Sequence, residues 1–228
     1  MPIPIGHLAS LPASIFTLIA IASLLLTFVM LGSRWLRHYL YAYGAQSWLI
    51  GLLSAGVAFY GGFPELYAIA VITCLFRGLL LPYLLLVIMR RLKVPREAHV
   101  ILQPSTTLVI AALAVVFALG VSWKITAELN LGGTVAVLAL TVMLAMSLLG
   151  FLMLGTRHEA MSQVLGLLIL ENGIFLGSQI LVPGMPFFLE TVILFDLLIV
   201  VACLGVLVNT LIVEAGTTSG LELKRLVG

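Results

Sequence analysis

The sequence predicts an all-α integral membrane protein, a bundle of seven transmembrane helices with the N-terminus outside and the C-terminus in the cytoplasm. Three observations predict this fold class. The composition is 62% hydrophobic and 9% charged, whereas soluble domains contain roughly 25% charged residues. The apolar residues form seven stretches of about membrane-spanning length, and the basic residues gather in alternate loops. A chain with so few charged residues cannot cover the surface of a soluble protein.

The predicted helices follow from the length of the apolar stretches, because a helix needs about 20 apolar residues to cross the hydrocarbon core. In order, they cover residues 13–31, 41–60, 66–89, 105–123, 131–154, 161–182 and 188–213. A short Val-Pro-Gly-Met-Pro turn joins the last two. We divide the chain into a four-helix region, residues 1–130, and a three-helix module, residues 131–228.

The orientation follows from the basic residues of the loops. Nine lie on one side of this arrangement and one, Lys124, lies on the other. Cytoplasmic loops are enriched in Lys and Arg, so the side with nine is predicted to be cytoplasmic. Such loops are expected to contact lipid head groups, and a net charge of only +2 disfavours nucleic acid as a partner. The nine are Arg34, Arg37, Arg90, Arg91, Lys93, Arg96, Arg157, Lys224 and Arg225.

Two parts of the chain resemble each other. Residues 30–34 read Met-Leu-Gly-Ser-Arg, and residues 153–157 read Met-Leu-Gly-Thr-Arg. With a shift of two residues, Gln46 aligns with Glu171 and Glu65 aligns with Glu190. One interpretation is a parallel repeat, in which the first three helices recur as the fifth to seventh. The other is chance similarity between apolar helices.

Glu171 lies in the middle of the sixth predicted helix, within a Leu-Leu-Ile-Leu-Glu-Asn-Gly run. A charge at the bilayer centre costs about 2.5–3.5 kcal/mol on insertion scales. Desolvation favours the neutral form of such a carboxyl, which allows it to bind and release protons near neutral pH. We therefore predict a proton-relay role for Glu171. The alternative is a protonated carboxyl that only hydrogen-bonds a neighbouring helix.

Asp196 and Arg77 are two further ionisable residues within predicted helices, the seventh and the third. Arg77 cannot be neutralised, so it must meet a carboxylate, carbonyl oxygens or water. We predict that both residues belong to the relay, with Arg77 pairing with Glu171 or Asp196. An ion pair that only holds helices together is the alternative. Gly78 and Pro82 follow Arg77 and predict a disturbed helix there.

Three more residues are candidates for proton entry or exit. Glu65 and Glu190 lie near the outer ends of the third and seventh predicted helices, and each is predicted to be a solvated carboxylate favoured by the helix dipole. His158, the third candidate, lies with Arg157 and Glu159 in a cytoplasmic turn that we interpret as an ordinary charged loop. Proton exit for the first pair and proton entry at the turn are the alternatives. The sequence contains no phosphate-binding loop, zinc motif or haem ligand pair, so we expect no cofactor and no metal.

The C-terminal part resembles the K-type subunit of complex I and the C-type subunit of multisubunit cation/proton antiporters. The resemblance lies in a basic turn, then Leu170-Glu171-Asn172, then Pro-Phe-Phe-Leu-Glu-Thr-Val-Ile-Leu over residues 186–194. It implies that Glu171 is the central relay glutamate of that family. A second family glutamate would fall at Cys203, whereas this chain has Asp196 two turns earlier on the same face.

The whole chain, with four helices before the K-like module, resembles the component E subunit of hydrogenase-4 and formate hydrogenlyase-type complexes. This resemblance implies a non-redox, non-catalytic subunit in the cytoplasmic membrane of a prokaryote. Its partners would be antiporter-like and other membrane-arm subunits and, indirectly, a nickel–iron hydrogenase arm. A subunit of a cation/proton antiporter without a redox arm, and a structural spacer without a relay role, are the alternatives.

Overall fold

The computed structural model describes residues 10–33, 35–91, 102–130, 133–157 and 160–181, and these form an all-α bundle. Three consecutive segments, α3, η2 and α4, make one continuous span in which the middle segment is a π-helix. The helices are α1 Ser10–Gly32, α2 Leu36–Gly61, α3 Glu65–Ile72, η2 Thr73–Leu80, α4 Leu81–Arg91, α5 Pro104–Glu128, α6 Thr134–Thr156 and α7 Ala160–Leu181.

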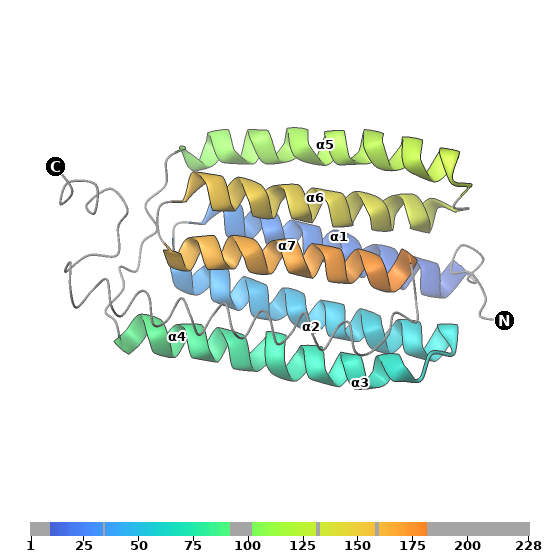
Figure 1. Cartoon of the computed structure of the whole chain (residues 1–228), viewed down its shortest axis with the longest axis horizontal. Helices are drawn as coiled ribbons and strands as arrows, with labels where there is room; N and C mark the ends of the chain where they lie inside the picture. Colours follow the sequence, from blue (N-terminus) through green and yellow to red (C-terminus); the bar gives the residue numbers. More distant parts are fainter. Residues whose placement is uncertain (1–9, 34, 92–101, 131–132, 158–159, 182–228) are drawn as a thin grey trace.

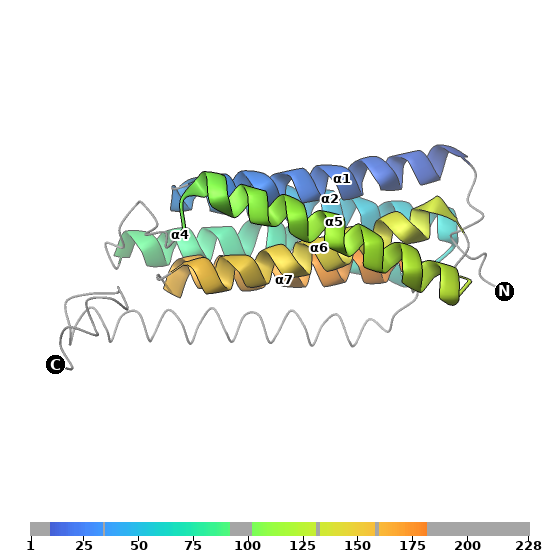
Figure 2. The ribbon, with the colours of Figure 1, turned by 90° about the horizontal axis from the view of Figure 1, so that it is seen from above.

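The spans lie side by side, and the chain reverses direction from each to the next (Figure 1). Helix α2 contacts α1, the α3–η2–α4 span and α7, while α6 contacts α1, α5 and α7. The view from above shows α1 and α7 on opposite sides of the described bundle, with α5 crossing it obliquely (Figure 2). The polar residues discussed below come mainly from α2, η2 and α7, which meet in the interior.

Five helices are long and apolar enough to cross a membrane, so the chain is a multi-pass membrane protein. They cover the first five predicted spans. Helix α7 forms over the sixth predicted range, whereas the seventh, residues 188–213, lies outside the described residues. The observed helices extend beyond the predicted ranges at several ends, because apolar length detects only the part of a helix that matches hydrocarbon. The division at residue 130 stays a prediction.

The helices differ in how much of their surface the bundle covers. In α2, 61% of its most apolar window is buried, whereas in α5 the value is 17%. Large side chains of α5 such as Phe117 and Trp123 are exposed. An apolar helix with an exposed surface is expected where lipid, rather than water, is the solvent. The interior of the bundle is therefore formed around α2, and α5 lies at its periphery.

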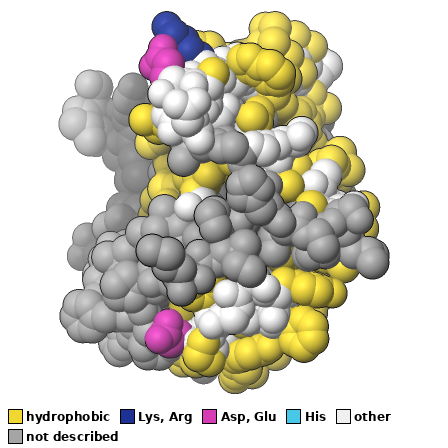
Figure 3. Space-filling view, turned by 90° about the vertical axis from the view of Figure 1, so that its right-hand side faces the viewer, with side chains coloured by type: hydrophobic (Ala, Val, Ile, Leu, Met, Phe, Trp, Pro, Cys, Tyr) yellow, Lys and Arg dark blue, Asp and Glu magenta, His cyan; other side chains and the backbone are white. Residues whose placement is uncertain are grey.

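The two ends of the bundle differ in charge. Arg37, Arg90 and Arg157 lie at the end where α1 finishes and α2 begins, which we call the basic end. Among the described side chains, Lys124 is the basic residue at the opposite end. Figure 3 shows this opposite end, where charged side chains are sparse among hydrophobic ones.

Glycines allow α6 and α7 to approach each other closely. A Cβ atom added at Gly150 of α6 would lie 2.7 Å from the carbonyl oxygen of Gly166 in α7. A Cβ atom added at Gly166 would lie 3.0 Å from the carbonyl oxygen of Gly150. Small residues at membrane helix interfaces permit such backbone contact, which provides the packing energy that lipid does not. This contact fixes α7, which contains Glu171, against α6.

We expect Gly150→Ala to lower the melting temperature of the protein in detergent by roughly 2–10 °C, because the added methyl group overpacks the α6–α7 interface. Gly155→Ala is the matched control in the same helix, since a Cβ atom there meets no atom within 4 Å. The control should match or slightly exceed the wild type, because alanine favours the helix. Equal melting temperatures for the two variants would contradict the close packing.

Candidate functional site

Arg77 lies on the π-helix η2, in the middle of the third span. In this segment the Leu81 N–H bonds the Phe76 carbonyl oxygen, five residues back. The disturbance predicted from Gly78 and Pro82 is therefore a widened helical turn that ends just before the proline. Proline has no N–H to offer the fourth carbonyl before it, and a π turn moves the donor along by one residue. Short π segments are often found at functional sites.

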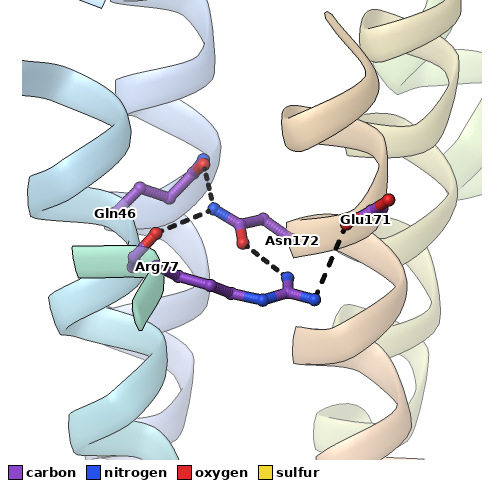
Figure 4. A network of polar contacts seen from close by, with 5 residues as sticks. Gln46, Arg77, Glu171 and Asn172 are labelled. Carbon is purple, nitrogen blue, oxygen red and sulfur yellow. Dashed lines mark hydrogen bonds and ion pairs between the residues drawn. The ribbon is translucent and has the colours of Figure 1, made fainter. Parts of the chain in front are cut away.

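The guanidinium of Arg77 is buried and meets three groups from α7, of which Asn172 and Glu171 are drawn in Figure 4. Its Nη1 donates to Asn172 Oδ1 at 3.0 Å, and its Nη2 lies 3.6 Å from Glu171 Oε2. Its Cζ lies 5.0 Å from the centre of the Phe175 ring, a cation–π distance. Of the two predicted carboxylate partners, Glu171 forms the ion pair, whereas Asp196 lies outside the described residues.

Asn172 connects this ion pair to two other helices. Its side-chain nitrogen donates to Gln46 Oε1 at 3.0 Å and to Ser47 Oγ at 3.3 Å. Gln46 in turn donates to the Ser23 carbonyl oxygen at 2.8 Å and to Thr27 Oγ1 at 2.9 Å. One continuous set of polar contacts therefore joins α1, α2, η2 and α7, and its members other than Glu171 are fully or almost fully buried.

A second polar contact between α2 and α7 lies about two helical turns beyond Ser47 and Asn172, further from the basic end. Gln179 of α7 donates to Ser54 Oγ of α2 at 2.6 Å, and the Ser54 hydroxyl donates to the Ile50 carbonyl oxygen at 3.0 Å. Ser54 and Gln179 are 125 positions apart, as are Ser47 and Asn172. Polar pairs thus recur at a seven-residue interval along the α2–α7 interface.

The two charged groups of the ion pair have different chemistry. The Arg77 side chain is 1% exposed and remains charged at every physiological pH, whereas Glu171 is 16% exposed and can accept a proton. A neighbouring cation favours the carboxylate, and desolvation favours the neutral acid. The arrangement therefore places a fixed positive charge beside one group whose proton occupancy can change.

Arg157 forms a second buried cluster at the basic end. Its side chain is 3% exposed, and its Nη2 donates to the Leu31 carbonyl oxygen at 2.9 Å. Its Cζ lies 5.5 Å from the centre of the Tyr39 ring, and the Tyr39 hydroxyl bonds the Ser33 carbonyl oxygen. The interpretation of Arg157 as an ordinary loop charge is wrong. The end of α1 has carbonyl oxygens without helical partners, and they draw the guanidinium inward.

The other predicted site residues are not brought to Arg77 by the described helices. Glu65 is the first residue of α3, is exposed and lies at the end opposite the basic end. His158, Glu190 and Asp196 lie outside the described residues. Among the residues that the structure describes, no group of three or more His, Cys, Asp and Glu side chains could hold a metal ion.

Sequence reasoning missed the role of Asn172. It noted Gln46 only as the counterpart of Glu171 in the proposed repeat, although both amides are fully buried here. The available signal was the position of Asn172 directly after a mid-span carboxylate. A buried amide must find partners for its donors and its acceptor, so a polar residue at that depth predicts polar residues on the helices facing it.

The comparisons with known proteins give one distant relative. No protein-family model matches the chain, and no solved structure matches it. The chain is similar to "Uncharacterized protein Rv0085" of Mycobacterium tuberculosis, with 29% identity over 147 residues. The match covers 64% of this chain and 66% of that protein, just under two thirds of its length. Function must therefore be argued from the residues of the site.

We expect Glu171→Gln to lower the free energy of unfolding by about 1–3 kcal/mol, because Arg77 loses its charged partner. In an Arg77→Met background the same change should be neutral or stabilising, since the carboxylate then lacks its cation. Thermal or denaturant unfolding of the four proteins in one detergent measures this coupling. An equal effect of Glu171→Gln in both backgrounds would show that the ion pair contributes nothing.

We expect Arg157→Gln to destabilise the protein by about 1–3 kcal/mol, because the end of α1 loses a hydrogen bond from a buried charged group. Arg37→Gln is the control at the same end of the bundle, where the side chain is exposed. The control should change stability by less than about 0.5 kcal/mol. Unfolding in detergent measures both, and similar losses would refute a specific role for Arg157.

Proposed function

We propose that this chain is a non-redox membrane subunit of a complex I-related, membrane-bound hydrogenase complex of the formate hydrogenlyase type. In this proposal Glu171 takes part in proton translocation, and Arg77 sets the electrostatic field around it. The observation that supports it is the ion pair within the bundle between Glu171 of α7 and Arg77, which lies on a π-helical segment in the middle of the third span. Buried ionisable residues in membrane spans are costly and commonly mark ion pathways.

The proposed partners are antiporter-like and other membrane-arm subunits, lipid and, indirectly, a nickel–iron hydrogenase arm. The proposed location is the cytoplasmic membrane of a prokaryote. The orientation, with the N-terminus outside and the C-terminus in the cytoplasm, is supported by Arg37, Arg90 and Arg157 at the basic end, which would face the cytoplasm. It also requires residues 188–213 as a seventh span.

We further propose that the fold contains the parallel repeat, with Gln46 as the counterpart of Glu171. Two contacts support it: Ser47 with Asn172, and Ser54 with Gln179. Each pair is separated by 125 positions, the offset that aligns Gln46 with Glu171. A two-fold axis along the membrane normal brings equivalent residues of two parallel helices together. The first copy would then contain an amide where the second contains a carboxyl.

A structural spacer is the second candidate function, and one specific observation favours it. The contacts of Asn172, Gln46 and Arg77 join four helices and could serve only to hold them in register. In that case, replacing Glu171 would reduce assembly of the complex before it changed proton movement. The two candidates therefore differ in which defect comes first.

We expect Glu171→Gln to lower proton movement coupled to the redox reaction by at least about tenfold, while the assembled complex is recovered in normal amount. Glu171→Asp is the conservative control, because it keeps a carboxyl and should retain a measurable part of the activity. Proton uptake into inverted membrane vesicles and subunit recovery after mild detergent extraction measure the two quantities. Unchanged proton uptake in Glu171→Gln would overturn the relay role, and recovery of antiporter subunits alone would favour the antiporter alternative.

A further inference from the structure

We infer that Asn172 is a positioning residue for Glu171, and that Gln46 orients Asn172 so that the guanidinium of Arg77 is held against the Glu171 carboxyl. The inference deepens the proposed function, on which its importance rests, by naming residues that regulate the proton occupancy of the same carboxyl. Asn172 does not exchange protons itself. It acts through Arg77.

The orientation of both amides is determined by groups that can act only as hydrogen-bond acceptors or only as donors. The Ser23 carbonyl oxygen can only accept, so Gln46 must turn its nitrogen towards it, at 2.8 Å. The Gln46 oxygen then faces Asn172, which must present its own nitrogen, at 3.0 Å. The Asn172 oxygen is left for Arg77, at 3.0 Å.

Arg77, at the other end of this set of polar contacts, requires the same orientation of the amides. A guanidinium can only donate, so the group that meets Arg77 Nη1 must be the oxygen of Asn172. The assignment from Ser23 and the assignment from Arg77 therefore agree. Turning either amide over would oppose two donors or two acceptors in a site without bulk water, which is costly.

This orientation of Asn172 determines where the guanidinium of Arg77 lies. The two terminal nitrogens of the guanidinium meet Asn172 and Glu171, which are adjacent residues on α7. The bond to Asn172 is short, whereas the ion pair with Glu171 is longer, at 3.6 Å. The hydrogen bond from Nη1 thus fixes the guanidinium, and the position of Nη2 beside the carboxyl follows from it. Loss of that bond would leave the guanidinium with the longer ion pair and the Phe175 ring as its described contacts, so its position beside the carboxyl would be less fixed.

A carbodiimide provides a test that needs no turnover. N,N′-dicyclohexylcarbodiimide reacts with a protonated carboxyl in an apolar site: the carboxyl oxygen bonds the central carbon, and the acid proton moves to a carbodiimide nitrogen. The O-acylisourea then rearranges to a stable N-acylurea. Labelling of the Glu171 peptide, measured by mass spectrometry on membranes that contain the full chain at one fixed pH, therefore reports how often this carboxyl holds a proton.

Asn172→Ala should increase the labelling rate of Glu171 by about fivefold, because the cation that favours the carboxylate is no longer held in place. Gln46→Ala, which leaves every contact of Arg77 intact, should give a smaller increase of about twofold. Gln179→Ala is the matched control. Gln179 is a buried amide of α7, as Asn172 is, but it bonds Ser54 and has no hydrogen bond to Arg77 in the described structure. This variant should label at the wild-type rate.

The decisive comparison uses an Arg77→Gln background. If Asn172 acts through Arg77, Asn172→Ala should add nothing to the labelling that Arg77→Gln already gives. An equal increase in both backgrounds, or an increase in Gln179→Ala as large as in Asn172→Ala, would overturn the inference, because simple loosening of α7 explains both. Wild-type labelling in Asn172→Ala would also overturn it.

If Asn172→Ala does not accumulate in membranes, Gln46→Ala replaces it in the wild-type and Arg77→Gln backgrounds, and its labelling is judged by the same criteria. The outcome is distinguishable from that of the transport experiment, since labelling requires neither a redox arm nor proton movement. Unchanged transport in Glu171→Gln would leave the labelling result valid, and wild-type labelling in Asn172→Ala would leave the transport result valid.

Discussion

The described bundle depends on burying one group, the guanidinium of Arg77, whose charge no protein environment neutralises. Hydrocarbon offers no partner for its donors, so other helices must supply oxygen atoms and a ring face. Asn172, Glu171 and Phe175 supply them, and all three belong to one face of one helix. The register of α7 against η2 is therefore set by chemistry at a single depth, because a shift by one residue would move all three partners away from Arg77 together.

Polar contacts of this kind require helices that approach each other closely, and glycines make that approach possible. A Cβ atom added at Gly44 of α2 would lie 3.3 Å from the Gly78 carbonyl oxygen, next to Arg77. Gly150 and Gly166 similarly bring α6 against α7. In lipid there is little hydrophobic gain from helix association, so close packing and interhelical hydrogen bonds must provide it. Glycines and buried amides thus both stabilise the association of helices in this fold.

The sequence was sufficient for the parts of the structure that depend on the membrane alone. Apolar length located the first five spans, and the cost of a charge in hydrocarbon identified Glu171 and Arg77 as residues that need partners, with Asp196 left as an alternative partner for Arg77. The sequence was insufficient where a side chain is held by residues of another helix. The burial of Arg157 depends on carbonyl oxygens at the end of α1, and the role of Asn172 depends on Gln46 across the bundle. Neither set of contacts is local in sequence.

The chemistry of the buried network also limits how a proton could reach Glu171. The groups that link the carboxyl to α1 are a guanidinium and two carboxamides, and none of these loses or gains a proton at physiological pH. Their hydrogen bonds have one fixed direction, so they cannot pass a proton by exchanging donor and acceptor roles. If Glu171 exchanges protons as proposed, the exchange would not pass through Arg77, Asn172 and Gln46. The interior of the bundle would then serve as the anchor of the relay and not as its path.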